Sequence, residues 1–444
     1  MGILLGTLPG TLLLATGFSN LLWAGDARIY QFMALGALSG MLLSPPAALV
    51  LGPLAAVVLL VVSGASFVAT GYLTVDHEPA PEEVPETRLH PRLATRAAGD
   101  EVSMAGIVLT TGPLSVGRRA ARIGTELDDA LQLFENNGWL DDPASYHQVP
   151  TPPEEVHSER RRHRGRVFEH LSFESGYEPW PEEPGRERWL SYEANRTAHA
   201  WVLRHPGEPR PWLVGLHGIR MGSPRGKFFL YRPEFLHEEL GLNLVLPVLP
   251  IHGPRKVGPV SGDRILSGDV MDTVHAGAQA IWDIRRLLAW LRLPEQNAPA
   301  IGVLGYSLGG YTAALLAGLE NDINGVTVAN PAVDPSGSFW RSSLSASIHY
   351  LKAEGVTEEK MSRLLRVVSP LAFAPTVPKN CRAIFAGVAD RIVPPSEALS
   401  LWRHWDRPRV VWYQGTHRGF LRTEEGKRAL TETLRASGLL TDNR

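Results

Sequence analysis

The stretch IGVLGYSLGGYTAALLAG, residues 301–318, decides the fold. Its first half is an apolar run that ends in GYSLG, residues 305–309, and small residues at helical spacing follow at once. This pattern predicts a buried strand that turns sharply into a helix. The backbone at so tight a turn is strained and bulky neighbours would collide there, so we expect Gly305 and Gly309 to relieve the crowding.

The pentapeptide matches the G-x-S-x-G pattern of a nucleophile elbow, in which a serine projects from the carboxyl edge of a sheet. Ser307 is therefore a candidate nucleophile. The alternative is a glycine-rich turn with a chance serine, because five residues alone are only moderately specific. A serine hydroxyl is a weak nucleophile without a base, so the rest of the chain must supply an acid and a base.

Short apolar runs rich in β-branched residues alternate with helical stretches from about residue 166 onward. The runs 166–175 and 197–205 are typical of an opening antiparallel pair. The remaining strand-like runs are residues 211–218, 242–250, 298–307, 323–331, 381–390 and 409–417. This alternation predicts the α/β class, with a mostly parallel sheet covered by helices on both faces and a ligand at the carboxyl ends of the strands.

Two further strand ends carry candidate chemistry. Asp390 ends the run 381–390, and His417 ends the last run. The chain order Ser, Asp, His at strand ends resembles the α/β-hydrolase superfamily, and the resemblance covers roughly residues 166–440. It implies that Ser307 attacks, that His417 is the base and that Asp390 orients the imidazole. Asp334 is the rival acid, because it follows the preceding strand.

The same resemblance implies an oxyanion hole. The backbone N–H groups of Leu308, next to the nucleophile, and of Ile219, after His217-Gly218, are the expected donors. His217 is expected to be a structural residue of this loop. His252 follows another strand and is either a residue at the mouth of the site or a hydrogen-bonded loop histidine.

Residues 330–370 lie between two strand-like runs and are much longer than an ordinary connection of ~2–6 residues. We predict a helical cap over the site. Tyr306, beside the nucleophile, and Trp340, in the cap, are candidate substrate contacts. Several cap residues line an acyl pocket or, alternatively, pack against the core: Phe339, Trp340, Ile348, Tyr350 and Leu351.

The composition argues against several other classes of protein. The chain has 444 residues and a net charge of -2, so no overall attraction to nucleic acid is expected. Its one cysteine, Cys381, cannot form an intrachain disulfide or a Cys-rich metal site. The sequence contains no H-E-x-x-H pair, P-loop or dinucleotide fingerprint, so we expect neither a metal nor a cofactor.

Residues 1–25 and 29–75 carry no charged side chain. Apolar runs of about 20 residues can cross a bilayer, so residues 1–75 are predicted to be a transmembrane region. Pro45-Pro46 is expected to divide the second run into arms of roughly 16 and 29 residues. Three spans are favoured, the first over residues 2–24; two spans and a buried soluble hairpin are the alternatives.

Residues 76–165 are predicted to be linkers around an accessory helix. The Pro- and Glu-rich stretch 76–92 and the stretch 147–166 have the composition of exposed linkers. Residues 115–140 have apolar positions at helical spacing, so we expect a helix that packs on the membrane or on the catalytic domain. The catalytic domain is then residues 166–444.

Positively charged residues near membrane spans tend to stay in the cytoplasm. Arg28 lies between the first two apolar runs, and Arg88, Arg92 and Arg96 follow the last one. Three spans place both groups on one side. We therefore expect an outside N-terminus and a hydrolase domain that faces the cytoplasm.

We interpret the chain as a membrane-anchored serine hydrolase that cleaves a carboxylic ester or thioester through an acyl-enzyme on Ser307. Its expected partners are a small-molecule or lipid ester and the membrane. An acyltransferase with the same acyl-enzyme is one alternative. The other is a membrane scaffold whose hydrolase-like domain only binds, although such a domain has no need of a complete Ser, Asp and His set.

Overall fold

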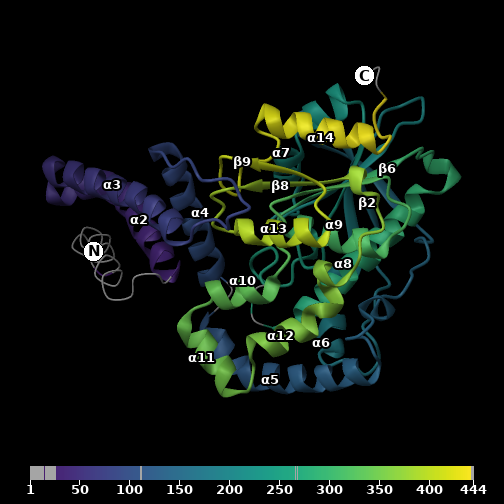
Figure 1. The fold of residues 1–444 in the computed structure, drawn as a ribbon, viewed down its shortest axis with the longest axis horizontal. Coiled ribbons are helices and arrows are strands. Elements are labelled where there is room, and N and C mark those ends of the chain that lie inside the picture. Colours follow the sequence, from purple (N-terminus) through teal and green to yellow (C-terminus); the bar gives the residue numbers. More distant parts are fainter. Residues whose placement is uncertain (1–14, 16–26, 111–112, 266, 268, 442–444) are drawn as a thin grey trace.

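The computed structural model describes residues 15, 27–110, 113–265, 267 and 269–441 (Figure 1). Its centre is one nine-stranded sheet in the order β1-β2-β3-β5-β4-β6-β7-β8-β9. The strands are β1 (His157–His163), β2 (Arg166–Glu174), β3 (Thr197–Leu203), β4 (Trp212–Leu216), β5 (Asn243–Pro247), β6 (Ile301–Tyr306), β7 (Gly325–Ala329), β8 (Arg382–Gly387) and β9 (Arg409–Tyr413).

The predicted architecture of the sheet is confirmed. Strands β1, β2, β3 and β5 pair antiparallel in that order, and the pairs from β5 through β9 are all parallel. Every residue of β4 to β8 is buried. Strands buried on both faces need helices on each side, which explains their continuous apolar sequences.

Helices cover both faces of the sheet (Figure 1). One face packs against α7 (Pro224–Tyr231), the π-helical turn Glu234–Glu239 and α14 (Glu424–Ala436). The other face packs against α8 (Val270–Leu291), α9 (Leu308–Leu319) and α13 (Pro395–His404). The 3₁₀ turns are Pro143–Tyr146, Glu193–Asn195, Gly253–Arg255, Pro294–Gln296, Leu365–Val368, Pro370–Ala372 and Lys379–Cys381.

The predicted helical segment between β7 and β8 is present. It contains α10 (Pro335–Ser342), α11 (Ser345–Ala353) and α12 (Glu358–Leu364). Asp334, the rival acid, caps α10, because its side chain accepts a hydrogen bond from the backbone N–H of Gly337 at 2.9 Å.

The accessory helix is α5 (Pro113–Asn136), and it packs on the sheet domain and on the segment between β7 and β8. Its apolar positions join the main core, Ile123 and Leu127 among them. Its Glu126 forms a salt bridge with Arg188 of α6 (Arg186–Leu190) at 2.6 Å, and Arg188 also reaches Asp272 of α8 at 2.9 Å. These contacts fasten α5 to the sheet domain.

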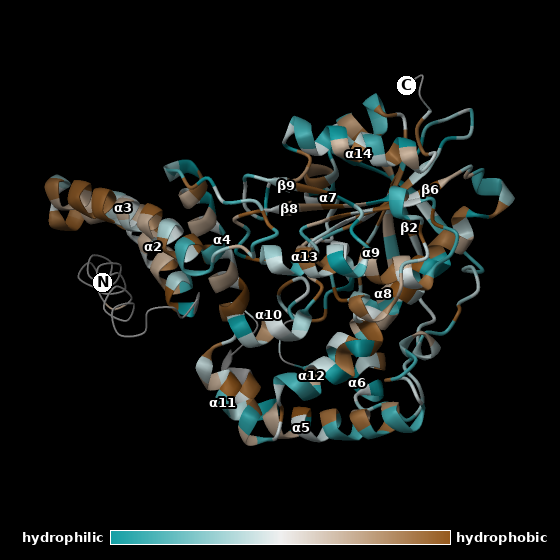
Figure 2. Ribbon diagram, viewed as in Figure 1, coloured by the Kyte–Doolittle hydropathy of each residue, from teal (hydrophilic) through white to brown (hydrophobic). Residues whose placement is uncertain are grey.

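Two helices near the N-terminus, α2 (Ala27–Leu51) and α3 (Pro53–His77), are long and apolar enough to cross a membrane. They project from the sheet domain, and Figure 2 shows their apolar character. Many of their large apolar side chains are exposed: Leu42, Leu49, Val50, Leu51, Leu54, Val57, Val58, Leu60, Val61, Val62 and Leu73. The predicted first span, residues 2–24, lies outside the described residues.

The predicted break at Pro45-Pro46 is wrong, because both prolines lie inside α2. Pro45 has no N–H for the carbonyl of Met41, and the Ser44 hydroxyl donates to that carbonyl instead at 2.8 Å. The chain breaks at Gly52, whose φ of 86° suits glycine, and Pro53 begins α3 with a preset φ. The second apolar run therefore forms two helices of similar length.

Helix α4 (Pro91–Thr110) joins the N-terminal helices to the sheet domain. It crosses α3 closely, since a Cβ added to Gly71 would lie 1.8 Å from the carbonyl oxygen of Ala94. The stretch before α4 is exposed along most of its length, as expected for a linker, but it also lies against the sheet domain. Val84 is buried beside Val388 and Leu399, and the hydroxyl of Thr87 donates to the carbonyl of Val388.

The second predicted linker, residues 147–166, also carries structure, because β1 extends the sheet upstream of residue 166. Its HSERRRH sequence is exposed along almost its whole length. An edge strand needs only backbone partners, and charged side chains on it discourage pairing with other chains. Such a strand lacks the apolar alternation from which strands are predicted.

Candidate active site

Ser307 lies where β6 turns into α9, as the elbow motif predicts. Its φ of 57° and ψ of -118° fall outside the conformations ordinary for a side-chain-bearing residue. Neighbouring elements hold this backbone in place. The Ser307 N–H donates to the carbonyl of Ala329 at 2.8 Å, and the Ser307 carbonyl accepts from the N–H of Tyr311 at 2.9 Å. Such strain is typical of functional sites.

The expected role of the two flanking glycines is confirmed. A Cβ added to Gly305 would lie 2.1 Å from the carbonyl oxygen of Gly309, and one added to Gly309 would lie 1.7 Å from that of Leu216. A Cβ added to Gly218 would lie 3.3 Å from the Cβ of Ser307, so the loop after β4 also lies against the elbow.

Asp390 and His417 form a buried pair. The Asp390 Oδ2 and the His417 Nδ1 are 2.7 Å apart, while the Asp390 Oδ1 accepts from the N–H groups of Ile392 and Val393, each at 2.9 Å. The hydroxyl of Tyr306, the residue before the nucleophile, donates to the carbonyl of His417 at 2.9 Å. The ends of β6, β8 and β9 therefore meet at one edge of the sheet.

The surroundings of His417 favour its charged form. Burial by itself would lower the pKa of this imidazole, but the charge of Asp390 and its hydrogen bond outweigh burial, and the pKa of His417 is raised. An imidazole in this setting can accept a proton and hold it beside a carboxylate. That is the behaviour required of a general base.

The expected oxyanion donors lie next to Ser307. Leu308 is the first residue of α9, where backbone N–H groups have no partner within the helix and favour negative charge. Leu308 and Ile219 line the same pocket as Ser307. His217 braces this loop: its Nδ1 lies 2.8 Å from the carbonyl oxygen of Gly218, and its Nε2 accepts from the N–H of Leu249.

Four of the candidate substrate contacts do not line the pocket that contains Ser307. Burial lowers the pKa of His217 well below its ordinary value and that of His252 to about 4, so both imidazoles are neutral. The Nδ1 of His252 lies 2.9 Å from the carbonyl oxygen of Pro250. These two histidines, Tyr306 and Trp340 are not among the lining residues of the pocket that contains Ser307, and the ammonium of Lys352 lies over the Trp340 ring.

The other cap residues divide between the pocket and the core. Phe339 of α10 lines the pocket, whereas Leu351 of α11 is fully buried in the main core. Tyr350 is half exposed and lies against Gly117 of α5.

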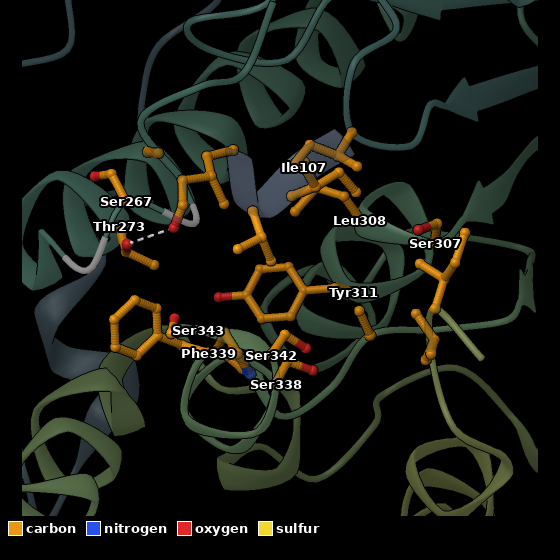
Figure 3. Close-up of a pocket in the computed structure, with 18 of the residues that line it drawn as sticks. Ile107, Ser267, Thr273, Ser307, Leu308, Tyr311, Ser338, Phe339, Ser342 and Ser343 are labelled. Carbon is orange, nitrogen blue, oxygen red and sulfur yellow. Dashed lines mark hydrogen bonds between the residues drawn. The ribbon is translucent and has the colours of Figure 1, made fainter. Parts of the chain in front are cut away.

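The pocket beside Ser307 is mainly apolar (Figure 3). In the view of Figure 3 the ring of Tyr311 lies between Ser307 and Thr273. The walls of the pocket come from six helices and the loops between them: Met104, Ile107 and Val108 of α4; Val116 of α5; Thr273, Ala276, Gly277 and Ala280 of α8; Leu308, Tyr311 and Thr312 of α9; Pro335, Ser338, Phe339 and Ser342 of α10; Ser347 of α11.

The contribution of α4 to this pocket was missed from sequence. The sequence does contain a pattern for this apolar face, because Met104, Ile107 and Val108 have the i, i+3, i+4 spacing of one side of a helix. The same spacing serves any packed helix, so it does not indicate what the face covers.

A model of the family described as Serine hydrolase (FSH1) matches residues 290–418, a range that holds Ser307, Asp390 and His417. Two proteins of Mycobacterium tuberculosis are similar over most of the chain: Uncharacterized protein MT2702 of strain CDC 1551 / Oshkosh and Uncharacterized protein Rv2627c of strain H37Rv. Each is 41% identical over 361 residues, which cover 81% of this chain and 86% of the relative. The chain belongs to the family of these mycobacterial proteins.

The similarity to these two relatives extends beyond the sheet domain. Each alignment covers 361 residues, whereas residues 166–444 number only 279. Among solved structures, acetyl xylan esterase 1 from a Thermoanaerobacterium species is 14% identical with a TM-score of 0.48, covering 68% of this chain and 93% of that one. An acetyl xylan esterase from a Paenibacillus species is 16% identical with a TM-score of 0.46, covering 68% and 94%. With its elbow and strand order, the sheet domain has the α/β-hydrolase fold.

The close packing of the elbow predicts the effect of Gly309→Ala. The added Cβ collides with the Leu216 carbonyl, which is backbone and cannot rotate away, so we expect a loss of about 3 kcal/mol or more in the free energy of unfolding. Urea unfolding in detergent measures it. Gly64→Ala on α3 is the control, because its Cβ meets nothing within 4 Å and alanine is the better helix former. Equal stability of both variants would contradict the close approach.

Proposed function

We propose that this protein is a membrane-associated serine esterase, which cleaves a carboxylic ester or thioester through an acyl-enzyme on Ser307. The observation that carries the proposal is the buried Asp390–His417 hydrogen bond, which lies at the same sheet edge as a strained serine that lines an apolar pocket. The serine hydrolase model over residues 290–418 supports it independently.

In the proposed reaction, the Ser307 Oγ attacks the ester carbonyl while the His417 Nε2 takes the hydroxyl proton. Asp390 accepts the Nδ1–H of His417 and stabilises the imidazolium. The N–H groups of Leu308 and Ile219 hold the oxyanion, and each such donor is typically worth about 3 kcal/mol. His417 then gives its proton to the leaving alcohol or thiol. A water attacks the acyl-enzyme with the same base, which releases the acid and restores Ser307.

The pocket supports an apolar acyl group as substrate. None of its described lining residues is charged, and those from α4 are Met104, Ile107 and Val108. Several lining hydroxyls are occupied within the protein; for example, Tyr311 donates to the carbonyl of Val368 and Thr312 to that of Leu308. Burial of an alkyl chain in such a site stabilises the complex by about 25 cal/mol per Å² of buried apolar area.

The N-terminal helices support a membrane location. The exposed apolar surface of α2 and α3 is far larger than isolated surface side chains require, and helices of 25 residues span a bilayer core of ~30 Å. Helix α4 connects this pair to the pocket wall. We infer that the acyl group belongs to an ester that partitions into the membrane.

The proposed roles predict how site variants react with a fluorophosphonate, which labels an activated serine. Ser307→Ala and His417→Ala abolish labelling and ester hydrolysis in folded protein. Asp390→Asn lowers the hydrolysis rate by about 10⁴-fold, because the imidazole is held in the wrong tautomer.

Asp334→Asn is the matched control for these variants, since Asp334 caps α10 and an amide oxygen can still accept that hydrogen bond. Full activity of Asp390→Asn together with loss of activity in Asp334→Asn would reverse the choice of acid. Continued labelling of Ser307→Ala at the wild-type rate would remove the proposed function.

The pocket wall predicts a change in acyl-chain preference. Ile107→Trp fills the α4 side of the pocket, so hydrolysis of long p-nitrophenyl esters falls while hydrolysis of the acetate persists. Leu109→Trp is the control, because Leu109 lies on the same helix, is 46% exposed and is not a lining residue. An unchanged chain-length profile in Ile107→Trp would show that the chain binds elsewhere.

The arginines near the apolar helices support three spans, an outside N-terminus and a cytoplasmic hydrolase domain. A reporter fused after Arg444 measures this orientation directly. Fluorescence of a cytoplasm-dependent reporter is the expected result. Alkaline phosphatase activity at the same position, without fluorescence, would place the domain outside and favour two spans.

A further inference from the structure

Helix α4 reaches the two loops that carry the proposed acid and base. The Oδ2 of Asp100 accepts the backbone N–H of His417 at 3.0 Å and the backbone N–H of Arg391, the residue after Asp390, at 3.4 Å. The Asp100 side chain is buried, with 2% exposure for the residue. One carboxyl group from the N-terminal region thus joins the loop after β8 to the loop after β9.

Neighbouring contacts hold the same two loops. The guanidinium of Arg391 forms salt bridges with Glu101 at 3.2 Å and with Glu78 at 2.6 Å. Glu101 also accepts from the hydroxyl of Thr74 on α3. On the other loop, Arg418 donates to the hydroxyl of Ser103 on α4 at 2.7 Å. The residue that follows each member of the Asp390–His417 pair is therefore tied to α4.

Several charged or titratable groups face Asp100. Asp390 and His417 lie opposite it, Arg391 and Glu101 beside it, and Tyr306, Tyr413 and Arg418 complete its surroundings. Burial, followed by the charge of Asp390, raises the pKa of Asp100 to about 7. The charge of Asp100 in turn helps to raise the pKa of His417.

A carboxyl group in this position is costly to stability. The pKa of Asp100 in the folded protein lies above its ordinary value. The protonated carboxyl therefore contributes fully to the free energy of unfolding at low pH, and this contribution is lost as the pH rises through about 7. An asparagine could accept the same two N–H groups without an ionised buried group. Hydrogen bonding alone therefore does not explain why the residue is an acid.

We propose that Asp100 is a positioning residue of the candidate active site, which keeps the Asp390 and His417 loops in register and adds a negative charge that strengthens His417 as a base. This inference rests on the proposed function for its catalytic meaning. It makes α4 part of the candidate active site, since this helix supplies both the Asp100 carboxyl and a wall of the acyl pocket.

The experiment compares full-length wild type and Asp100→Asn in detergent. The imidazole of His417 is titrated by NMR with labelled histidine, and kcat/KM is measured against pH on one ester. The charge of Asp100 helps to raise the pKa of His417, so its loss is expected to lower that pKa, by about half a pH unit or more for a unit charge a few ångströms away. The acidic limb of kcat/KM shifts to lower pH by the same amount.

Asp128→Asn is the matched control, because it removes a charge of the same sign from α5 at an exposed site paired with Lys360. Its His417 titration should equal that of the wild type. An unchanged His417 titration in folded Asp100→Asn overturns the inference, because a merely structural acceptor would leave the imidazole unaffected.

If Asp100→Asn does not fold, Asp100→Ser and the wild type itself provide the test. In wild type labelled at arginine, the amide of Arg391 donates to Asp100 and should shift as that carboxyl ionises near pH 7. A His417 titration in folded Asp100→Ser that equals that of the wild type also overturns the inference. The NMR titrations need no turnover, so they remain decisive even if Ser307→Ala shows that the proposed esterase function is wrong.

Discussion

The close approach of three backbone segments around Ser307 is the constraint on which the rest of the site depends. Gly309 lies against the carbonyl of Leu216, and Gly305 lies against the carbonyl of Gly309. Only glycine permits this spacing, and Ser307 between the two glycines has a positive φ. The serine is thereby raised to the edge of the sheet with the start of α9 behind it. The candidate oxyanion donors, the pocket and the Asp390–His417 pair are all arranged around that position.

The parallel sheet explains why these groups meet. Strands β6, β8 and β9 run in the same direction, so their carboxyl ends and the loops that follow lie on one edge. Tyr306 links two of these loops through its hydrogen bond to the His417 carbonyl. A buried histidine beside a buried carboxylate is stable here because the ring Nδ1 and both carboxylate oxygens have defined partners.

The N-terminal region has two roles in this picture. Helices α2 and α3 expose apolar surface suited to a bilayer, while α4 turns back onto the sheet domain. Buried charges fix that return: Arg391 bridges Glu78 and Glu101, and Asp100 binds the N–H of His417. Removing one partner from such a buried charged network strongly destabilises the fold, so α4 and the loops after β8 and β9 form one structural unit.

Local patterns in the sequence determined the α/β class, the six later strands, the elbow serine and the positions of Asp390 and His417, because each depends on residues close together in the chain. The tertiary structure decided the rest. Strand β1 depends on backbone pairing rather than on an apolar pattern, and the helix break falls at Gly52 because Ser44 compensates for Pro45. Asp100 and His417 are 317 residues apart. No local pattern links groups so distant in the chain, and only packing of α4 on the sheet edge brings a carboxylate from the N-terminal region to the proposed catalytic histidine.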